Sequence, residues 1–89
     1  MKKIVLELEK MRSLPALHQH LHIALALPEY YGSNLDALYD CLTDITEPTE
    51  LVVPQKVAAD EYLGWYGKQF LQVLQDATEQ NAALKLSLV

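Results

Sequence analysis

The first half of the chain contains two kinds of hydrophobic pattern. Residues 4–6, with Leu8 beyond them, form a short, apolar and partly β-branched run that predicts a strand buried on both faces. From Ser13 onward, apolar residues recur at helical spacing. We expect this helix to end near Leu27, because Pro28 disfavours helical backbone in the residue before it.

A second helix is predicted from about Ser33 to Asp44, and its two faces differ in character. One face carries Leu35, Leu38, Leu42 and Ile45, and the opposite face carries Asp36, Asp40 and Asp44. Like charges four residues apart destabilise a helix by about 0.2–0.5 kcal/mol per pair. With Ser33 as the N-cap, Asp36 would occupy the third helical position, where a carboxylate favours the positive helix end. The acidic row therefore indicates either a solvated face or a surface for a cation or a basic partner.

The second half of the chain again alternates between strand and helix patterns. In chain order we expect a strand, a short helix, a longer helix and a strand over residues 51–53, 55–63, 68–80 and 84–89. Pro54 stops the first of these strands, and Gly64 and Gly67 mark a break before the longer helix. Asn81 is expected to end that helix.

Strands separated by helices favour an α/β fold with a parallel sheet. We expect one domain over residues 1–89, a small two-layer structure in which a three-stranded parallel sheet is packed by helices. A composition of 51% hydrophobic and 21% charged residues is that of a globular chain. The single cysteine, Cys41, excludes an intrachain disulfide and favours a reducing, cytoplasmic setting.

The charge of the chain narrows the class of partner. The formal net charge is −5 and the pI is near 5.0. Because nucleic-acid binding needs clustered Lys and Arg, a basic protein fits this charge better than RNA or DNA. The start of the chain lacks the apolar segment of a signal peptide, and no run reaches the roughly 20 apolar residues that span a membrane.

Histidines and acids suggest metal sites, but neither set is complete. His18 and His22 share a helix face without an HExxH pattern or a nearby third ligand, whereas a zinc site uses at least three protein ligands. The simpler interpretation of these histidines is a solvated face. The acidic row extends over two helical turns, which suits a single Mg²⁺ poorly. With no GxSxG motif and no Gly-rich phosphate loop, we expect no metal, no cofactor and no catalytic residue.

Tyrosines gather around the acidic row. Tyr30 and Tyr31 precede it, and Tyr39 lies within it. Tyrosine is enriched at protein interfaces because its ring combines rigid apolar area with a polar tip. At least one of the adjacent pair is expected to pack inward. A second aromatic group is expected in the core or against the sheet: Trp65, Tyr66 and Phe70.

The segment around this row carries a family resemblance. Residues 25–32 read LALPEYYG, and residues 34–38 and 40–43 read NLDAL and DCLT. This closely resembles the barstar family, the intracellular inhibitors of barnase-type ribonucleases. Residues 12–13, 17–19 and 71–73 and the closing strand also have counterparts in the same order. The resemblance implies a three-stranded parallel sheet and a binding face, formed by the second helix and the loop before it, that plugs a ribonuclease active site.

By position, the resemblance implies these contact residues: Tyr30, Tyr31, Gly32, Asn34, Leu35, Asp36, Tyr39, Asp40, Thr43, Asp44 and Asp76. Asp40 would be the central anion, Asp36 would meet a nearby basic residue, and Tyr30 would pack over a catalytic histidine. Three places depart from the family pattern, namely Tyr39 for Trp, Asp44-Ile45 for Gly-Trp, and Asp76 for Glu.

The favoured hypothesis is a cytoplasmic, non-enzymatic inhibitor that binds a barnase-like ribonuclease as a monomer in a 1:1 complex. One alternative is a regulator that keeps the fold but binds a different basic protein, its own kind included, because interfaces discriminate through a few contacts such as those that depart here. The other alternative is a metal-dependent enzyme built on the acidic row or on the histidines.

Overall fold

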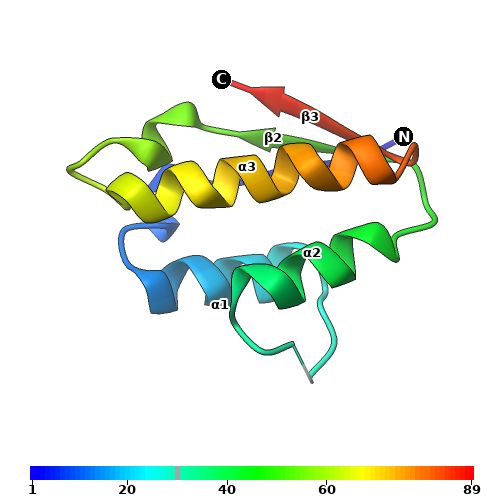
Figure 1. The fold of residues 1–89 in the computed structure, drawn as a ribbon, viewed down its shortest axis with the longest axis horizontal. Coiled ribbons are helices and arrows are strands. Elements are labelled where there is room, and N and C mark those ends of the chain that lie inside the picture. Colours follow the sequence, from blue (N-terminus) through cyan, green and yellow to red (C-terminus); the bar gives the residue numbers. More distant parts are fainter. Residues whose placement is uncertain (30) are drawn as a thin grey trace.

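The computed structural model describes residues 1–29 and 31–89, and its elements follow one another as expected of an α/β fold (Figure 1). In chain order they are β1 (Lys2–Val5), the 3₁₀ turn η1 (Leu8–Lys10), α1 (Leu14–Ala24), α2 (Leu35–Thr43), β2 (Thr49–Val53), the 3₁₀ turn η2 (Gln55–Ala58), α3 (Gly64–Gln80) and β3 (Leu84–Leu88). The predicted fold class, α/β with a three-stranded parallel sheet packed by helices, is confirmed.

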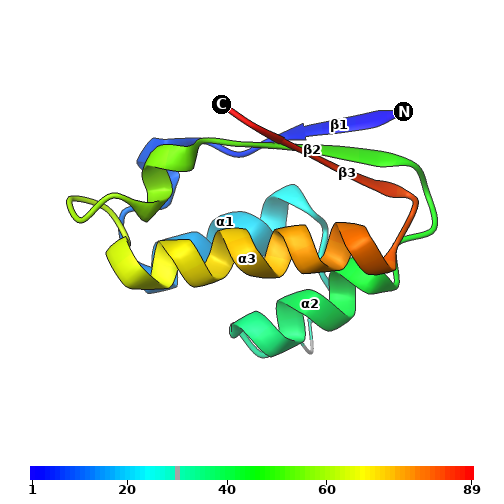
Figure 2. The same ribbon diagram turned by 45° about the horizontal axis from the view of Figure 1, so that its top comes forward.

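The sheet is covered on one face only. Its strand order is β1-β2-β3 with both pairs parallel, and the helices lie together on one side of it (Figure 2). The prediction that the first strand is buried on both faces is wrong, because Ile4 is 9% exposed and Val5 is 55% exposed. Successive strand residues point to opposite faces, so the strand buries Ile4 against the helices and leaves Val5 on the open side.

The first helix ends earlier than Pro28 requires. Ser13 caps its start, since the Ser13 hydroxyl accepts a hydrogen bond from the Ala16 N–H at 3.3 Å. At its end, Ala26 has a φ of 50°, and the N–H of Leu27 donates to the carbonyl of His22 at 3.0 Å. This is a Schellman-type ending, so α1 stops at Ala24 and not near Leu27 as predicted.

The start of α2 is also set by a cap, but not by the predicted residue. The Asn34 side chain, and not that of Ser33, accepts a hydrogen bond from the Ala37 N–H at 2.8 Å. Ser33 precedes the cap with a φ of 53°. Asp36 is therefore the second helical residue, still in the first turn, where the helix dipole favours an anion.

The glycines near the start of α3 do not break the helix. The predicted interruption at Gly64 and Gly67 is wrong, because α3 begins at Gly64 and continues through Gly67. A Cβ atom at position 67 would collide with the backbone of Val57. Glycine is needed there because α3 approaches η2 closely. The helix predicted over residues 55–63 is shorter in the structure, where η2 covers Gln55–Ala58 and turns follow it.

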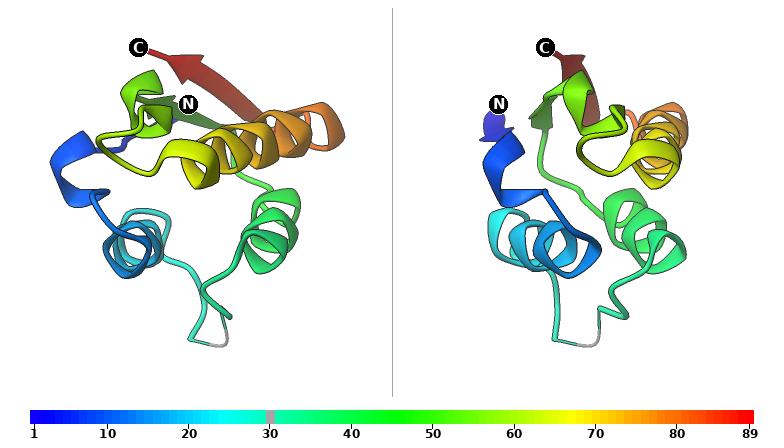
Figure 3. Two further views of the ribbon diagram at one scale, coloured as in Figure 1. Left: turned by 60° about the vertical axis from the view of Figure 1, so that its left-hand side comes forward. Right: turned by 90° about the vertical axis from the view of Figure 1, so that its left-hand side faces the viewer.

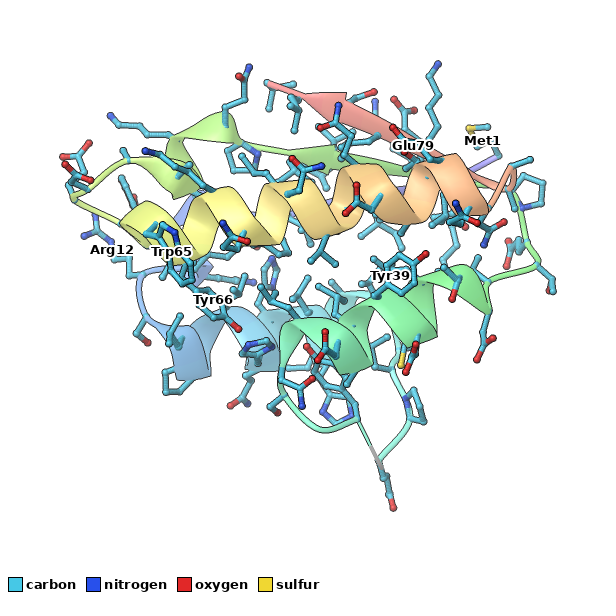
Figure 4. The ribbon with its side chains drawn as sticks, viewed as in Figure 1. Met1, Arg12, Tyr39, Trp65, Tyr66 and Glu79 are labelled. Atoms are coloured by element: carbon cyan, nitrogen blue, oxygen red, sulfur yellow. The ribbon has the colours of Figure 1, made fainter. Side chains whose placement is uncertain are left out.

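The core lies between the sheet and the helices, and one predicted core aromatic is absent from it. Phe70 is fully buried on the inner stripe of α3, and Tyr66 is partly buried. Trp65 was expected in the core, but it is 72% exposed near the start of α3 (Figure 4). It is one position away from the buried stripe, so the helical period turns it outward.

None of the helices within residues 1–29 and 31–89 has the length and hydropathy needed to cross a membrane.

The ending of α1 generates a stability prediction. Ala26 has a left-handed backbone conformation, which is unfavourable for L-residues with a Cβ atom. Ala26→Gly should therefore raise the free energy of unfolding by about 0.5–1 kcal/mol, measured by urea denaturation. The matched control is Ala24→Gly in the last turn of α1, which should lower it by up to about 1 kcal/mol. Destabilisation by both changes would contradict the assignment of Ala26 as the left-handed cap.

Candidate functional site

The outer face of α2 carries the acidic row predicted from the sequence. Asp36, Asp40 and Asp44 are all exposed, whereas Leu38 and Leu42 on the opposite face are fully buried. The helical stripe predicted for the leucines is therefore the face that packs into the core. The three carboxylates project to solvent from one continuous surface.

These acids have no cationic partner among the described residues. The ion pairs found there join Lys10 to Glu7, Arg12 to Glu9 and Lys56 to Glu61, all away from α2. The dipole of α2 favours Asp36 in the first turn, but it disfavours an anion at Asp44, the C-cap. The helix thus carries uncompensated negative charge over most of its length.

Tyr39 and Thr43 flank Asp40 on α2. The ring of Tyr39 lies between α2 and α3 and packs against the core (Figure 4). The Thr43 hydroxyl lies 3.1 Å from the carbonyl oxygen of Tyr39 and 3.0 Å from that of Asp40, and it donates to them. Both contacts keep the last turn closed, and they leave the hydroxyl oxygen of Thr43 able to accept from a partner.

The connection between α1 and α2 lies on the side of the helices away from the sheet (Figure 3). Tyr30, a predicted contact residue, is outside the described residues. The Asn34 Nδ2 donates to the carbonyl of Gly32 at 3.2 Å while its Oδ1 caps α2. One side chain therefore fixes both the end of the loop and the start of the helix. Leu35, the first helical residue, is partly buried.

Tyr31 is only 8% exposed, and it anchors the loop to a buried histidine. Its hydroxyl lies 2.6 Å from Nδ1 of His18, and the hydroxyl of Tyr66 lies 2.8 Å from Nε2 of the same ring. A neutral imidazole has one donor and one acceptor nitrogen, so two phenols satisfy it completely. The cluster links α1, the loop and α3.

Burial sets the protonation states of this cluster. It lowers the pKa of His18 and raises the pKa of both Tyr31 and Tyr66, so all three groups are neutral near neutral pH. The expectation that the histidines form a solvated face is wrong for His18, which is 5% exposed, whereas His22 is exposed. His18 is a structural hydrogen-bonding centre, and its nitrogens are already occupied.

Asp76 projects from α3, and not from the acidic helix. It is partly buried, and its carboxylate accepts a hydrogen bond from Nε2 of Gln72 at 2.9 Å. Glu79, one turn further along, is exposed and points away from Tyr39 (Figure 4). The role of Asp76 as a contact residue stays a prediction.

Residues 1–29 and 31–89 contain no cluster of three or more His, Cys, Asp or Glu that could hold a metal ion. Cys41 on α2 is a free, partly buried thiol. Burial raises its pKa, and the neighbouring charges of Asp44 and Asp40 raise it further. It is therefore a thiol and not a reactive thiolate near neutral pH.

Sequence reasoning missed two residues that support this face. His18 was assigned to solvent, although it lies three residues before the buried Leu21, a spacing that places both side chains on one helix face. Asn81 was expected only to end a helix, and it does cap α3. Its side chain also reaches the end of α2, where Nδ2 lies 2.9 Å from the carbonyl oxygen of Leu42 and 2.8 Å from that of Ile45. Asn81 and Ile45 are 36 residues apart in the chain, and no local sequence pattern predicts such a contact.

Comparison with known proteins gives two findings. Residues 1–89 match a protein family described as "Barstar (barnase inhibitor)". The chain is also 38% identical over 81 residues to a protein of Bacillus subtilis (strain 168) named "Putative ribonuclease inhibitor YrdF". That match covers 90% of this chain and 89% of the Bacillus protein.

The buried cluster generates a second stability prediction. Tyr31→Phe removes the hydroxyl that satisfies Nδ1 of His18 and leaves a buried ring nitrogen without a partner. The free energy of unfolding should fall by about 1–3 kcal/mol, measured by urea denaturation near pH 7. Tyr66→Phe should cost less, because water can replace a partly buried hydroxyl. Equal small losses in the two variants would show that the Tyr31 contact does not anchor the loop.

Proposed function

The chain belongs to the barstar family, and we propose that it inhibits a barnase-type ribonuclease by covering the active site of that enzyme. The observation that carries the proposal is the row of exposed carboxylates, without ion-pair partners in residues 1–29 and 31–89, on a helix that buried contacts hold in place. A ribonuclease active site binds phosphates with cationic side chains. Carboxylates spaced along a rigid helix offer such a site anions in place of the RNA backbone.

The proposed binding face consists of α2, the loop before it and one residue of α3. Its residues are Tyr30, Tyr31, Gly32, Asn34, Leu35, Asp36, Tyr39, Asp40, Thr43, Asp44 and Asp76. Asp40 lies at mid-helix and is proposed to be the central anion. Asp36 meets a basic residue at the rim of the cleft. Tyr31 contributes mainly by holding the loop, because its ring is buried.

Charge also favours rapid encounter with the enzyme. The net charge of −5 gives the chain a negative field, and the acids on α2 concentrate that field on the proposed face. Such fields speed association with a basic partner, and salt screens them. The inhibitor needs no chemistry of its own, because occupying the active site is sufficient. We propose a monomer that forms a 1:1 complex in the cytoplasm.

A second candidate keeps the face and changes the partner. Asp44 is exposed at the C-cap of α2, and Tyr39 packs against the core, at two of the positions that depart from the family pattern. An additional anion at the helix end favours an enzyme, or another basic protein, with a cation at the matching position. Specificity is a difference of affinities, and a few such contacts change it.

The direct experiment titrates the protein against purified barnase and follows RNA cleavage at low salt. Inhibition that saturates at one inhibitor per enzyme supports the proposal, and the association rate should fall as salt is added. Unchanged cleavage at excess protein would mean that barnase is not the target. The same titration against other basic ribonucleases would then test the second candidate.

The position of Asp40 generates a residue-level prediction. Truncating one member of a buried, hydrogen-bonded charge pair costs about 2–5 kcal/mol or more, and the barnase–barstar complex is itself a reference case for such pairs, so Asp40→Ala should raise Kd at least about thirtyfold. The matched control is Glu79→Ala, which removes an exposed acid outside the proposed face and should change Kd by less than about threefold. If both variants lose affinity by a similar small factor, Asp40 is not the central anion of the interface.

A further inference from the structure

The last turn of α2 is held by an amide that comes from outside the proposed face. Nδ2 of Asn81 lies 2.9 Å from the carbonyl oxygen of Leu42, 2.8 Å from that of Ile45 and 3.4 Å from that of Thr43. Oδ1 of Asn81 accepts from the Ala83 N–H at 3.0 Å. Carbonyl oxygens only accept and a backbone N–H only donates, so the partners fix the orientation of the amide.

The backbone of Asn81 is fixed as firmly as its side chain. Its N–H donates to the carbonyl of Ala77 at 2.9 Å and ends α3, and its carbonyl accepts from the Leu84 N–H at 3.0 Å at the start of β3. The position of the amide is therefore determined by the end of α3 and the start of β3. Through that amide, the end of α2 is tied to the junction between α3 and β3.

The Asn81 amide supplies hydrogen-bond donors to the C-terminal end of α2 without adding positive charge there. The final carbonyls of a helix carry partial negative charge and need donors, and Lys or Arg commonly supplies them. A cation at the end of α2 would neutralise part of the field made by Asp40 and Asp44. A neutral amide donates two hydrogen bonds without adding positive charge, so it closes the turn and preserves the field.

We propose that Asn81 is a positioning residue of the inhibitory face. Its amide holds the C-terminal turn of α2 in the one arrangement that presents Asp40, Thr43 and Asp44 together to the partner. The inference rests on the proposed function, but the state of the free helix tests it separately. Without the amide, the carboxylates remain and still attract a basic enzyme, but the turn that carries them opens more often.

The first test measures amide hydrogen exchange of the free protein by NMR for Asn81→Ala. The control is Val57→Ala, which truncates a fully buried side chain in η2, at the other end of the molecule from the last turn of α2 (Figure 1). Exchange is compared after correction for the measured global stability of each variant. We expect the amides of residues 42–45 to exchange about tenfold faster in Asn81→Ala than in the control.

The second test separates positioning from stability by measuring binding kinetics with barnase. The association rate should be almost unchanged in Asn81→Ala, because the charges are intact, whereas the dissociation rate should rise about tenfold. Val57→Ala lowers stability but should leave the dissociation rate of the folded protein unchanged. A merely structural role for Asn81 would give the two variants the same dissociation rate, and that result would overturn the proposal.

A third variant covers the case in which Asn81→Ala does not fold. Asn81→Ser keeps one short donor, and it should show the same changes at a smaller magnitude. If wild-type protein fails to bind barnase, the proposed function fails for that enzyme, and the exchange measurement still decides the positioning role. Equal exchange of residues 42–45 in the position-81 variant and in Val57→Ala would overturn the inference whether or not barnase binds.

Discussion

The negative charge on the outer face of α2 determines how this helix has to be held in the fold. A helix with three outward carboxylates and no cationic partner among the described residues gains nothing from its outer face, so its stability must come from the inner face and the ends. Leu38 and Leu42 supply the inner face. The Asn34 cap and the Tyr31–His18 contact hold the beginning, and the amide of Asn81 holds the end. Each of these anchors is uncharged under neutral conditions, so the negative field of α2 persists.

The sheet, which the helices cover on one face only, supports the segments that hold α2. The sheet has three short parallel strands with helices on a single face, so the core lies in one layer between the sheet and the helices. Helix α2 contacts this core mainly by packing on α3 (Figure 2). The Gly67 approach to η2 fixes the beginning of α3, and Asn81 fixes its end. Because α3 is held at both ends and α2 packs on it, the position of α2 relative to the sheet is fixed through α3. Rigidity matters for binding because a preorganised surface loses less conformational entropy in the complex.

Much of this arrangement could be predicted from periodicity. The alternation of apolar strands and amphipathic helices was sufficient for the α/β class, and the spacing of Leu35 to Ile45 placed the acids on the exposed face. What failed was the assignment of single residues whose role depends on distant neighbours. Val5 is exposed because no described helix covers its side of the sheet, and His18 is buried because two tyrosines from other segments reach it. The second role of Asn81 depends on the packing of α2 beside α3, which sequence spacing does not reveal. The family resemblance supplied the prediction of a binding face on α2 and the loop before it, and the structure shows the contacts that hold these segments in place.

We propose that α2 and the loop before it form the surface that meets a ribonuclease. The most direct measurement is an NMR titration of isotope-labelled protein with catalytically inactive barnase, read at every backbone amide. We expect the large shifts and the new protection from exchange to fall within residues 28–45 and near Asp76, with little change at Lys3, Val52 and Lys85 on the open face of the sheet. Shifts concentrated on the open face, with α2 unchanged, would contradict it.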